Sequence, residues 1–281
     1  MKLPTTNFAR PFGLLTLAAG IVALSAPVAL ASQNECGTRG ASIIQKAYPS
    51  AKSTSDGLFE AGGETIKLPT DSGDDPHSMI CRIWPARPEL TLVAVPLMRE
   101  QSDDGNEGDI ELLVVDSDSL DLKARLRLPK LMSDDAVFVS SVAFDTARYH
   151  LAPGKTAFGL RLSLQGSSRP NPFGETALWL FLLDDDALKP VLDNIVVAEG
   201  QGEWDTNCAG EFHDTARTLS MSPSAQRAFA DIVVSEKKTT TISAPDKDGE
   251  CIDKKQTTAG EYRLRYEGAA YRVPKELQRM E

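Results

Sequence analysis

The segment Ile110–Leu128, "IELLVVDSDSLDLKARLRL", carries the pattern that decides the fold. A continuous apolar run leads into a turn-like stretch rich in Asp and Ser, and an arm of alternating apolar and polar residues follows. Alternation with a period of two indicates a strand with one buried face, and Asp and Ser favour turns between strands. The segment therefore predicts a β-hairpin.

The same layout returns later in the chain. Ala177–Leu183, "ALWLFLL", is followed by "DDDA" and then by Leu188–Val197, "LKPVLDNIVV". Asp184 in this copy matches Asp116 in the first, 68 positions earlier. The chain is therefore predicted to contain a repeated hairpin.

A tetrapeptide repeats at nearly the same spacing. Asp145–Arg148 and Asp214–Arg217 both read Asp-Thr-Ala-Arg, and each is followed by an apolar stretch and a proline. The two could supply carboxylate–guanidinium pairs. We interpret them instead as turns that form a corner of each unit, because Asp and Thr side chains accept bonds from nearby backbone N–H groups.

These matches predict an all-β fold of repeated four-stranded antiparallel units with a period of about 68 residues. The units are expected at about 55–130, 136–198 and 210–274. Such units suggest either a propeller-like arrangement or a β-sandwich, and the pattern favours neither. A short N-terminal helix is predicted at Ala41–Tyr48. No long helical period separates the units, which argues against an α/β fold.

The N-terminus has the features of a secretory signal peptide. Lys2 and Arg10 precede the apolar stretch Phe12–Leu24, and small residues end at Ala31. Cleavage there would remove residues 1–31 and leave 32–281 as a single all-β domain. A lipoprotein is excluded because Cys36 does not directly follow the small residues. We expect a bacterial protein that is periplasmic or secreted, with no membrane span in the mature chain.

All four cysteines lie beyond that segment, at Cys36, Cys81, Cys208 and Cys251. An even count in an oxidising compartment indicates two disulfides. Of the three possible pairings we favour Cys36–Cys81 and Cys208–Cys251, because each closes a local loop. Zinc is disfavoured, since no two cysteines have the spacing of a zinc motif. The formal net charge of −10 argues against a nucleic-acid partner.

No catalytic motif is evident. The three histidines, His77, His150 and His213, fall in no HExxH pattern, and no GxSxG motif occurs. A tryptophan platform for sugars is conceivable, but Trp84, Trp179 and Trp204 fit core packing better, two of them next to cysteines. The residues favour a non-enzymatic protein without a cofactor.

The repeat register predicts a binding face. Three polar loops, Arg99–Asp109, Ser167–Glu175 and Lys237–Gly260, join the second and third strands of their units. Equivalent loops emerge on one face, and loops on a rigid scaffold are where binding usually lies. Phe173 is expected to be solvent-exposed and close to the first loop. The candidate binding residues are Arg169, Asn171, Phe173, Asp103, Asp104 and Asn106.

The first loop also resembles part of a calcium site. Asp104, Asn106 and Asp109 have some of the required spacing of oxygen ligands around a glycine turn. No glutamate follows at the EF-hand position, so acidic turns that keep strand ends hydrated explain the segment better.

These features predict a non-enzymatic binding or protein-interaction module that engages another periplasmic or envelope component through its loop face. The alternative is an extracytoplasmic hydrolase of envelope sugar or peptide that uses acidic loop residues, because paired carboxylates have no sequence motif. A calcium-stabilised structural module is a third possibility.

Overall fold

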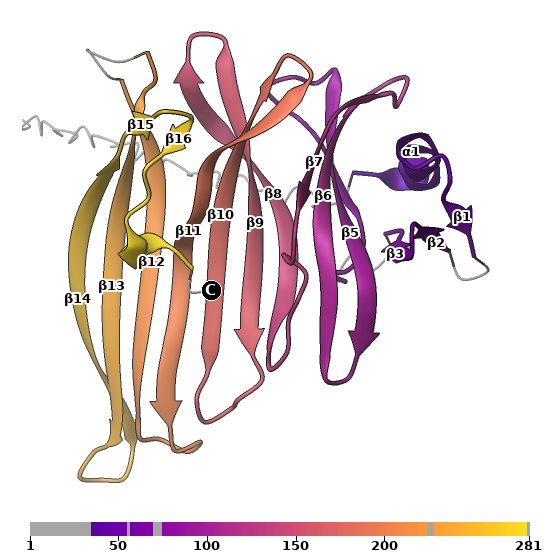
Figure 1. Cartoon of the computed structure of the whole chain (residues 1–281). Helices are drawn as coiled ribbons and strands as arrows, with labels where there is room; N and C mark the ends of the chain where they lie inside the picture. The colour runs from indigo at the N-terminus through magenta and orange to yellow at the C-terminus, as the bar shows by residue number, and fades with distance from the viewer. Residues whose placement is uncertain (1–34, 55–56, 70–74, 224–227, 280–281) are drawn as a thin grey trace, which may run out of the picture. The chain divides into compact units, whose positions relative to one another are not determined.

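A computed structural model describes residues 35–54, 57–69, 75–223 and 228–279. The predicted signal peptide and its cleavage site lie outside the described residues. Within the described part, no helix is long and apolar enough to cross a membrane. The structure is built almost entirely from antiparallel strands in two large sheets, which confirms the prediction of an all-β fold (Figure 1).

The first large sheet, which we call sheet A, has seven strands. They are β1 (Lys52–Ser53), β2 (Leu58–Ala61), β3 (Glu64–Lys67), β4 (Ile80–Ile83), β5 (Leu90–Ser102), β6 (Gly105–Asp116) and β7 (Leu122–Leu128). The order is β1-β2-β3-β5-β6-β7, and β4 pairs with β5 outside this path. The predicted hairpin at Ile110–Leu128 is present as β6 and β7.

The second sheet, sheet B, also has seven strands. They are β8 (Val137–Ala152), β9 (Lys155–Gly166), β10 (Phe173–Asp184), β11 (Ala187–Trp204), β12 (Gly210–Ser222), β13 (Asp231–Pro245) and β14 (Cys251–Leu264). Each strand pairs with its sequence neighbours, so the sheet is a meander that ends at β14. Tight turns join β8 to β9 and β10 to β11, because short polar or glycine-containing stretches separate their apolar runs.

Short elements flank the sheets. They are η1 (Gly37–Arg39), α1 (Gly40–Ala47), β15 (Tyr266–Glu267), β16 (Ala270–Tyr271) and η2 (Lys275–Leu277). The predicted N-terminal helix is thus confirmed as α1. Its residues Ile43 and Ile44 are fully buried against one face of β5 and β6, where Val93 and Val95 lie in the same apolar cluster.

The other face of β5 and β6 packs against sheet B. Leu92 and Leu112 share a core with Phe158 and Trp179, which lie on β9 and β10. Trp84 packs edge-on against Phe158 with ring centroids 5.3 Å apart. The alternate residues of β10 point to the opposite side of sheet B, so this strand is buried on both faces.

That opposite side of sheet B is covered by the C-terminal segment. Tyr271 and Leu277 bury themselves among apolar residues of β10, β11 and β13. The Asn194 side chain binds the Arg279 backbone through both its oxygen and its nitrogen. In Figure 1 this segment, drawn in yellow, runs across the sheet in front of its strands.

The structure does not divide into separate four-stranded sheets. The predicted units 136–198 and 210–274 are joined, because β11 pairs with β12 from Ala198 to Trp204. Neither large sheet closes on itself. The period of about 68 residues and the choice between a propeller and a sandwich stay predictions.

The repeated tetrapeptides are not turns, which corrects our interpretation. Asp145–Arg148 lies within β8 and Asp214–Arg217 within β12. Nor does either form an internal ion pair: Asp145 binds Arg161 at 2.6 Å, and Arg217 binds buried Glu236 at 2.8 Å. The preference of Asp and Thr side chains for turns is overridden here by strand pairing. Asp145 still accepts a hydrogen bond from the Ala147 N–H, where the pairing of β8 with β9 has a bulge.

Candidate functional site

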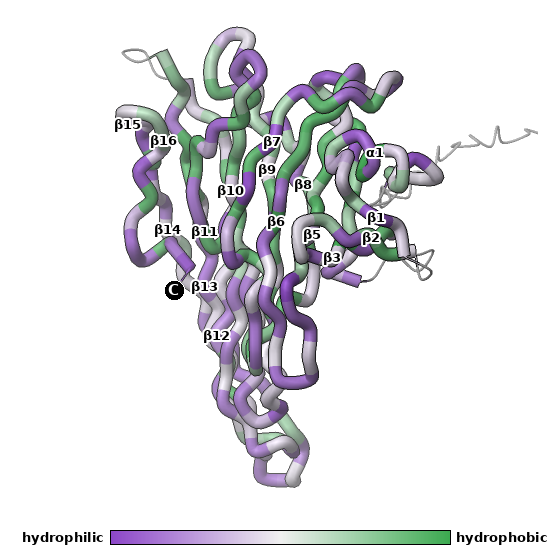
Figure 2. Tube along the Cα trace, turned by 45° about the vertical axis from the view of Figure 1, so that its right-hand side comes forward, coloured by the Kyte–Doolittle hydropathy of each residue, from purple (hydrophilic) through white to green (hydrophobic). Residues whose placement is uncertain are grey.

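Five strand connections lie at one end of the sheets, which we call the loop end. They join β5 to β6, β7 to β8, β9 to β10, β11 to β12, and β13 to β14, and they lie at the bottom of Figure 1. Alternate connections of a meander fall at the same end, so this grouping follows from the strand order. Figure 2 shows that the lowest part of sheet B is mainly hydrophilic.

The predicted loops are shorter than expected. β5 and β6 extend so far that only Asp103 and Asp104 remain between them. The expected loop Lys237–Gly260 is mostly strand, with its turn at 246–250. Arg169 and Asn171 lie in the connection from β9 to β10 and are exposed.

Phe173 differs from the prediction. It begins β10, is half-buried and packs against the core between the two sheets, so it is not a fully exposed side chain. The proline-containing connection before it brings the ring back towards the sheet. Phe173 and Asn106 nevertheless line one cleft, which brings together two of the predicted binding residues from different loops.

This cleft between the two sheets has a volume of about 650 Å³. Asn106 and Asp134 form one wall, joined by a side-chain hydrogen bond of 2.6 Å and by two backbone hydrogen bonds. Glu175 of β10 and Arg279 of the C-terminal segment lie on the other side. The walls therefore come from three parts of the chain.

Glu175 is the most perturbed acid in the cleft. Its side chain is 9% exposed, and the nearest cation is Arg279, with Nε 3.6 Å from Oε1. Burial raises the pKa of Glu175, Arg279 opposes this, and the nearby charge of Glu199 raises it further. A carboxyl group that resists ionisation inside a cleft is a candidate for proton transfer or hydrogen-bond donation.

The predicted calcium ligands have other partners. Asp109 binds Arg99 at 3.1 Å and Arg127 at 2.6 Å. Burial raises the pKa of Asp109, but hydrogen bonds from Arg99, the Lys130 N–H and Arg127 lower it to about 2. Asn106 is bound to Asp134, as described above. No group of three or more metal-ligating side chains occurs among the residues that the structure describes.

Bare backbone lies on the other face of sheet B at the loop end. Gly174 of β10 pairs directly with Gly200 of β11, and their neighbours on the two sides are Gln165 and Asp214. A pair of facing glycines leaves the peptide groups accessible to anything that approaches the sheet. Two neighbouring hollows on this face share Gly174, Gly200 and Asp214 in their lining, and together we call them the trough.

Two aromatic residues close one end of this trough. The Phe212 ring lies over Gly202 and Gly210, where an added Cβ atom would come within 2.6 Å and 2.9 Å of the ring. Trp204 lies under the Arg169 guanidinium, 5.8 Å from the ring centroid. Both rings are half-exposed. The expectation that Trp204 is a core residue is therefore wrong, whereas Trp84 and Trp179 are in the core.

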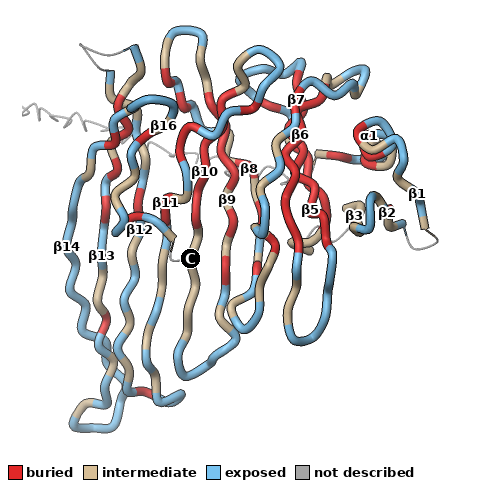
Figure 3. The backbone as a smooth tube through the Cα atoms, viewed as in Figure 1, coloured by how far each residue is buried: buried red, intermediate tan, exposed pale blue. Residues whose placement is uncertain are grey.

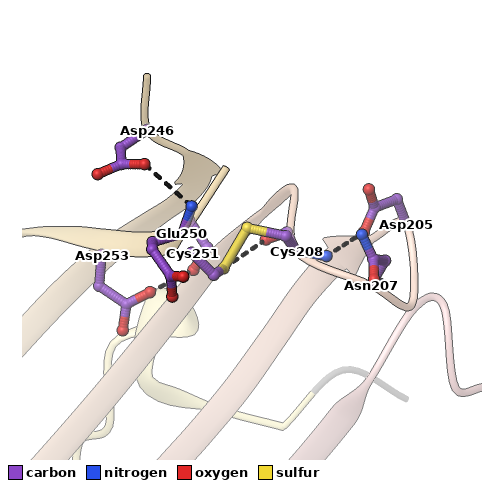
Figure 4. The surroundings of a disulfide bond; sticks show 8 residues. Asp205, Asn207, Cys208, Asp246, Glu250, Cys251 and Asp253 are labelled. Carbon is purple, nitrogen blue, oxygen red and sulfur yellow. Dashed lines mark hydrogen bonds between the residues drawn. A yellow bond between two sulfur atoms is a disulfide. The ribbon is translucent and has the colours of Figure 1, made fainter. Parts of the chain in front are cut away.

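A disulfide fastens the tip of this region, as Figure 4 shows. Cys208 is bonded to Cys251, and Cys36 to Cys81, which confirms both predicted pairs. Asp205 accepts the N–H of Cys208, and Asp246 accepts that of Glu250. Carboxylates thus accept backbone N–H groups in the turns on both sides of the disulfide. The disulfide holds the connection from β11 to β12 against β14.

The histidines are scattered. His150 bonds to Thr156 on the neighbouring strand, and His213 lies beside Glu211 and Thr240 on the opposite face from Phe212. His77 lies beside Asp75 in sheet A, with its Nδ1 3.4 Å from Oδ1. None of these three lies in the cleft or the trough described above.

Comparison with known proteins gives no relative, because no family model, no curated protein and no solved structure matches this chain. The site is therefore defined by its own geometry. Sequence reasoning did not single out Glu175 or Phe212, and it considered Trp204 for a sugar platform but assigned it to the core. Glycines at 200 and 202 within a strand were the available signal, since glycine inside a strand often marks a close approach.

Proposed function

We propose that this protein is a non-enzymatic binding module, outside the cytoplasm, that holds a glycan chain of the cell envelope in the trough at its loop end. The observation that carries this proposal is the bare Gly174–Gly200 backbone beside two half-exposed aromatic rings. Two disulfides fit a location outside the cytoplasm.

The lining of the trough suits a sugar chain. Sugar rings have an apolar face that stacks on Trp and Phe, and their hydroxyl groups need short polar partners. Thr241, Ser243 and Asp253 line the trough next to Phe212, and Asp214 lies beside the glycines. A flat floor of backbone admits an extended chain, whereas larger side chains at these positions would fill the space.

Tryptophan fluorescence offers a direct test. Trp84 and Trp179 are 1% and 7% exposed, so Trp204 is the tryptophan that a ligand in the trough would contact. Titration with soluble cell-wall oligosaccharides should change the emission saturably, and Trp204→Ala should abolish the change. Arg169→Ala should weaken binding about two- to fivefold, as expected for an exposed cation–π contact.

Arg148→Ala is the matched control, because Arg148 is also an exposed arginine and lies on β8, outside the lining of the trough. Calorimetry measures the same affinities without a fluorophore. Absence of binding to any of the oligosaccharides, or an unchanged affinity in Trp204→Ala, would count against the proposal.

A second candidate function is hydrolysis of an envelope glycan, and one observation favours it. Glu175 has a raised pKa and pairs across the strands with Glu199. Glycoside hydrolysis uses one carboxylic acid as proton donor and one carboxylate as base or nucleophile. Release of reducing sugar ends that is lost in both Glu175→Gln and Glu199→Gln would support this function, and a stable, uncleaved complex would exclude it.

A further inference from the structure

The last strand of sheet B has an open edge. β14 pairs with β13 along its whole length, from Cys251 to Leu264, without a register shift. Figure 3 shows this edge strand exposed along most of its length, at the left of the sheet. By contrast, the pairing of β8, the strand at the other end of the sheet, has three register shifts. Bulges, prolines, short strands and charged side chains normally protect an edge, and β14 has only the last of these, including Lys254 and Lys255.

The turn before β14 determines which of its residues hydrogen-bond to β13 and which face the open edge. The Asp246 N–H donates to the Glu250 carbonyl at 2.8 Å, so the next pair, Pro245 and Cys251, is not hydrogen-bonded. Alternation along the strand then directs the peptide groups of the even-numbered residues, including Thr258, towards β13. The odd-numbered residues from Asp253 to Arg263 direct their N–H and C=O groups to the open edge.

We propose that β14 pairs antiparallel with β14 of a second copy of this chain, with the two-fold axis at Thr258, which gives a dimer with one continuous sheet. Opposite residues must point to the same face, so the axis passes through a residue position. The odd-numbered residues then form the hydrogen-bonded pairs, and each pair exchanges two backbone hydrogen bonds, about twelve in all.

Charge selects Thr258 among the possible centres. In this register Lys255 lies opposite Glu261 and Asp253 lies opposite Arg263, each pair occurring twice. A centre at Thr257 would place Asp253 against Glu261, and a centre at Ala259 would place Lys255 against Arg263. Opposite charges across a strand pair stabilise it, and like charges destabilise it.

Of the two charge pairs, Lys255–Glu261 is the one whose side chains are more available for pairing between the copies. Both residues are exposed, and neither forms an ion pair within the described part of the chain. Arg263 already contacts Asp231 at 3.5 Å, so it is less available. Lys255 pairs with Thr241 of β13, a residue that lines the trough. The dimer therefore places the trough faces of both copies on the same side of one sheet.

Cross-linking tests the register. Thr258 would face its counterpart in a non-hydrogen-bonded pair with Cα atoms about 4.5 Å apart, within the range of about 4.4–6.8 Å that a disulfide spans. Thr258→Cys should therefore oxidise to a covalent dimer. Gln256→Cys is the matched control, exposed on the same face of β14, but its two copies would lie about 13 Å apart. Equal cross-linking of both variants, or none with Thr258→Cys, would overturn the register.

Charge reversal tests the pairing without a new cysteine. Sedimentation equilibrium of the intact protein should give the mass of two chains and show dissociation on dilution. Lys255→Glu and Glu261→Lys should each weaken the dimer about tenfold, and the double variant should restore it. Monomer melting temperatures should not change, since both side chains are exposed. A monomeric wild type at all concentrations, as expected if the edge serves a different protein, would overturn the proposal.

Discussion

Glu175 and Glu199 lie directly opposite each other on β10 and β11, and the pKa of Glu175 is raised above its usual 4.5 by burial. The folded protein therefore binds the proton of this carboxyl group more tightly than the unfolded chain does. We predict that the free energy of unfolding falls as the pH rises above 4.5 and through the raised pKa of Glu175. Glu175→Gln should remove this slope.

Urea unfolding at a series of pH values measures this effect. Glu203→Gln serves as control, because Glu203 is an exposed acid on the same sheet. A slope that persists in Glu175→Gln would assign the proton to another group.

Asp109 stabilises sheet A through two arginines. Asp109→Ala leaves Arg99 and Arg127 without this partner, and we expect a loss of about 2 kcal/mol in the free energy of unfolding. The pKa of Asp109 is lowered to about 2, so its contribution is complete above about pH 4 and is lost as the pH falls through 2. Asp103→Ala, in the exposed turn of the same hairpin, should be nearly neutral. Equal destabilisation by both changes would contradict this account.

Leu277 anchors the C-terminal segment. It is completely buried, so Leu277→Ala should lower the free energy of unfolding by about 2–4 kcal/mol through lost contacts and the cavity that remains. Leu122→Ala, at a leucine that is 36% exposed, should cost less than about 1 kcal/mol. Urea denaturation measures both. A small effect at Leu277 would mean that the segment does not seal the core.

The two disulfides should differ in their effects. They enclose similar lengths of chain, 45 and 43 residues, so chain entropy predicts roughly 4 kcal/mol for each. Cys36 and Cys81 are also fully buried among apolar residues, and replacing both by Ser adds the cost of burying two hydroxyl groups. We therefore expect the larger fall in melting temperature for that pair.

Replacement of Cys208 and Cys251 should act mainly at the tip. Faster amide hydrogen exchange is expected in the turns at 205–209 and 246–250, with little change in β9 and β10. Uniform loss of protection across sheet B would show that the bond stabilises the whole sheet. A thiol assay on the unreduced protein should find no free cysteine.

Local patterns predicted the elements of the fold better than their assembly. The alternation in Ile110–Leu128 gave the β6–β7 hairpin, because one buried face is visible in a short stretch. The pairing of β11 with β12 was not predictable, since backbone groups carry it and the strands there expose both faces. The tetrapeptides at Asp145 and Asp214 were misinterpreted for the same reason: their side chains favour turns, and the neighbouring strands override that preference.

Within the candidate site, the sequence predicted only which loop side chains are exposed to solvent. Arg169 and Asn171 are exposed because polar and proline residues surround them in the sequence. The raised pKa of Glu175 depends on its burial in the folded chain, and Arg279, which opposes the shift, lies far along the sequence, so no local pattern reveals it. The half-exposure of Trp204 depends on the tertiary structure around the end of β11, where the Arg169 guanidinium lies over the ring.

The position of the C-terminal segment has a consequence for the order of folding. Synthesis proceeds from the N-terminus, and the hairpins of sheet B can form one after another as each new strand emerges. Leu178, Leu180 and Ile195 stay uncovered until Tyr271 and Leu277 arrive, because these residues close the same core. The segment that carries Tyr271 and Leu277 therefore completes this core, and a chain whose C-terminal segment is still held by the ribosome cannot complete its fold.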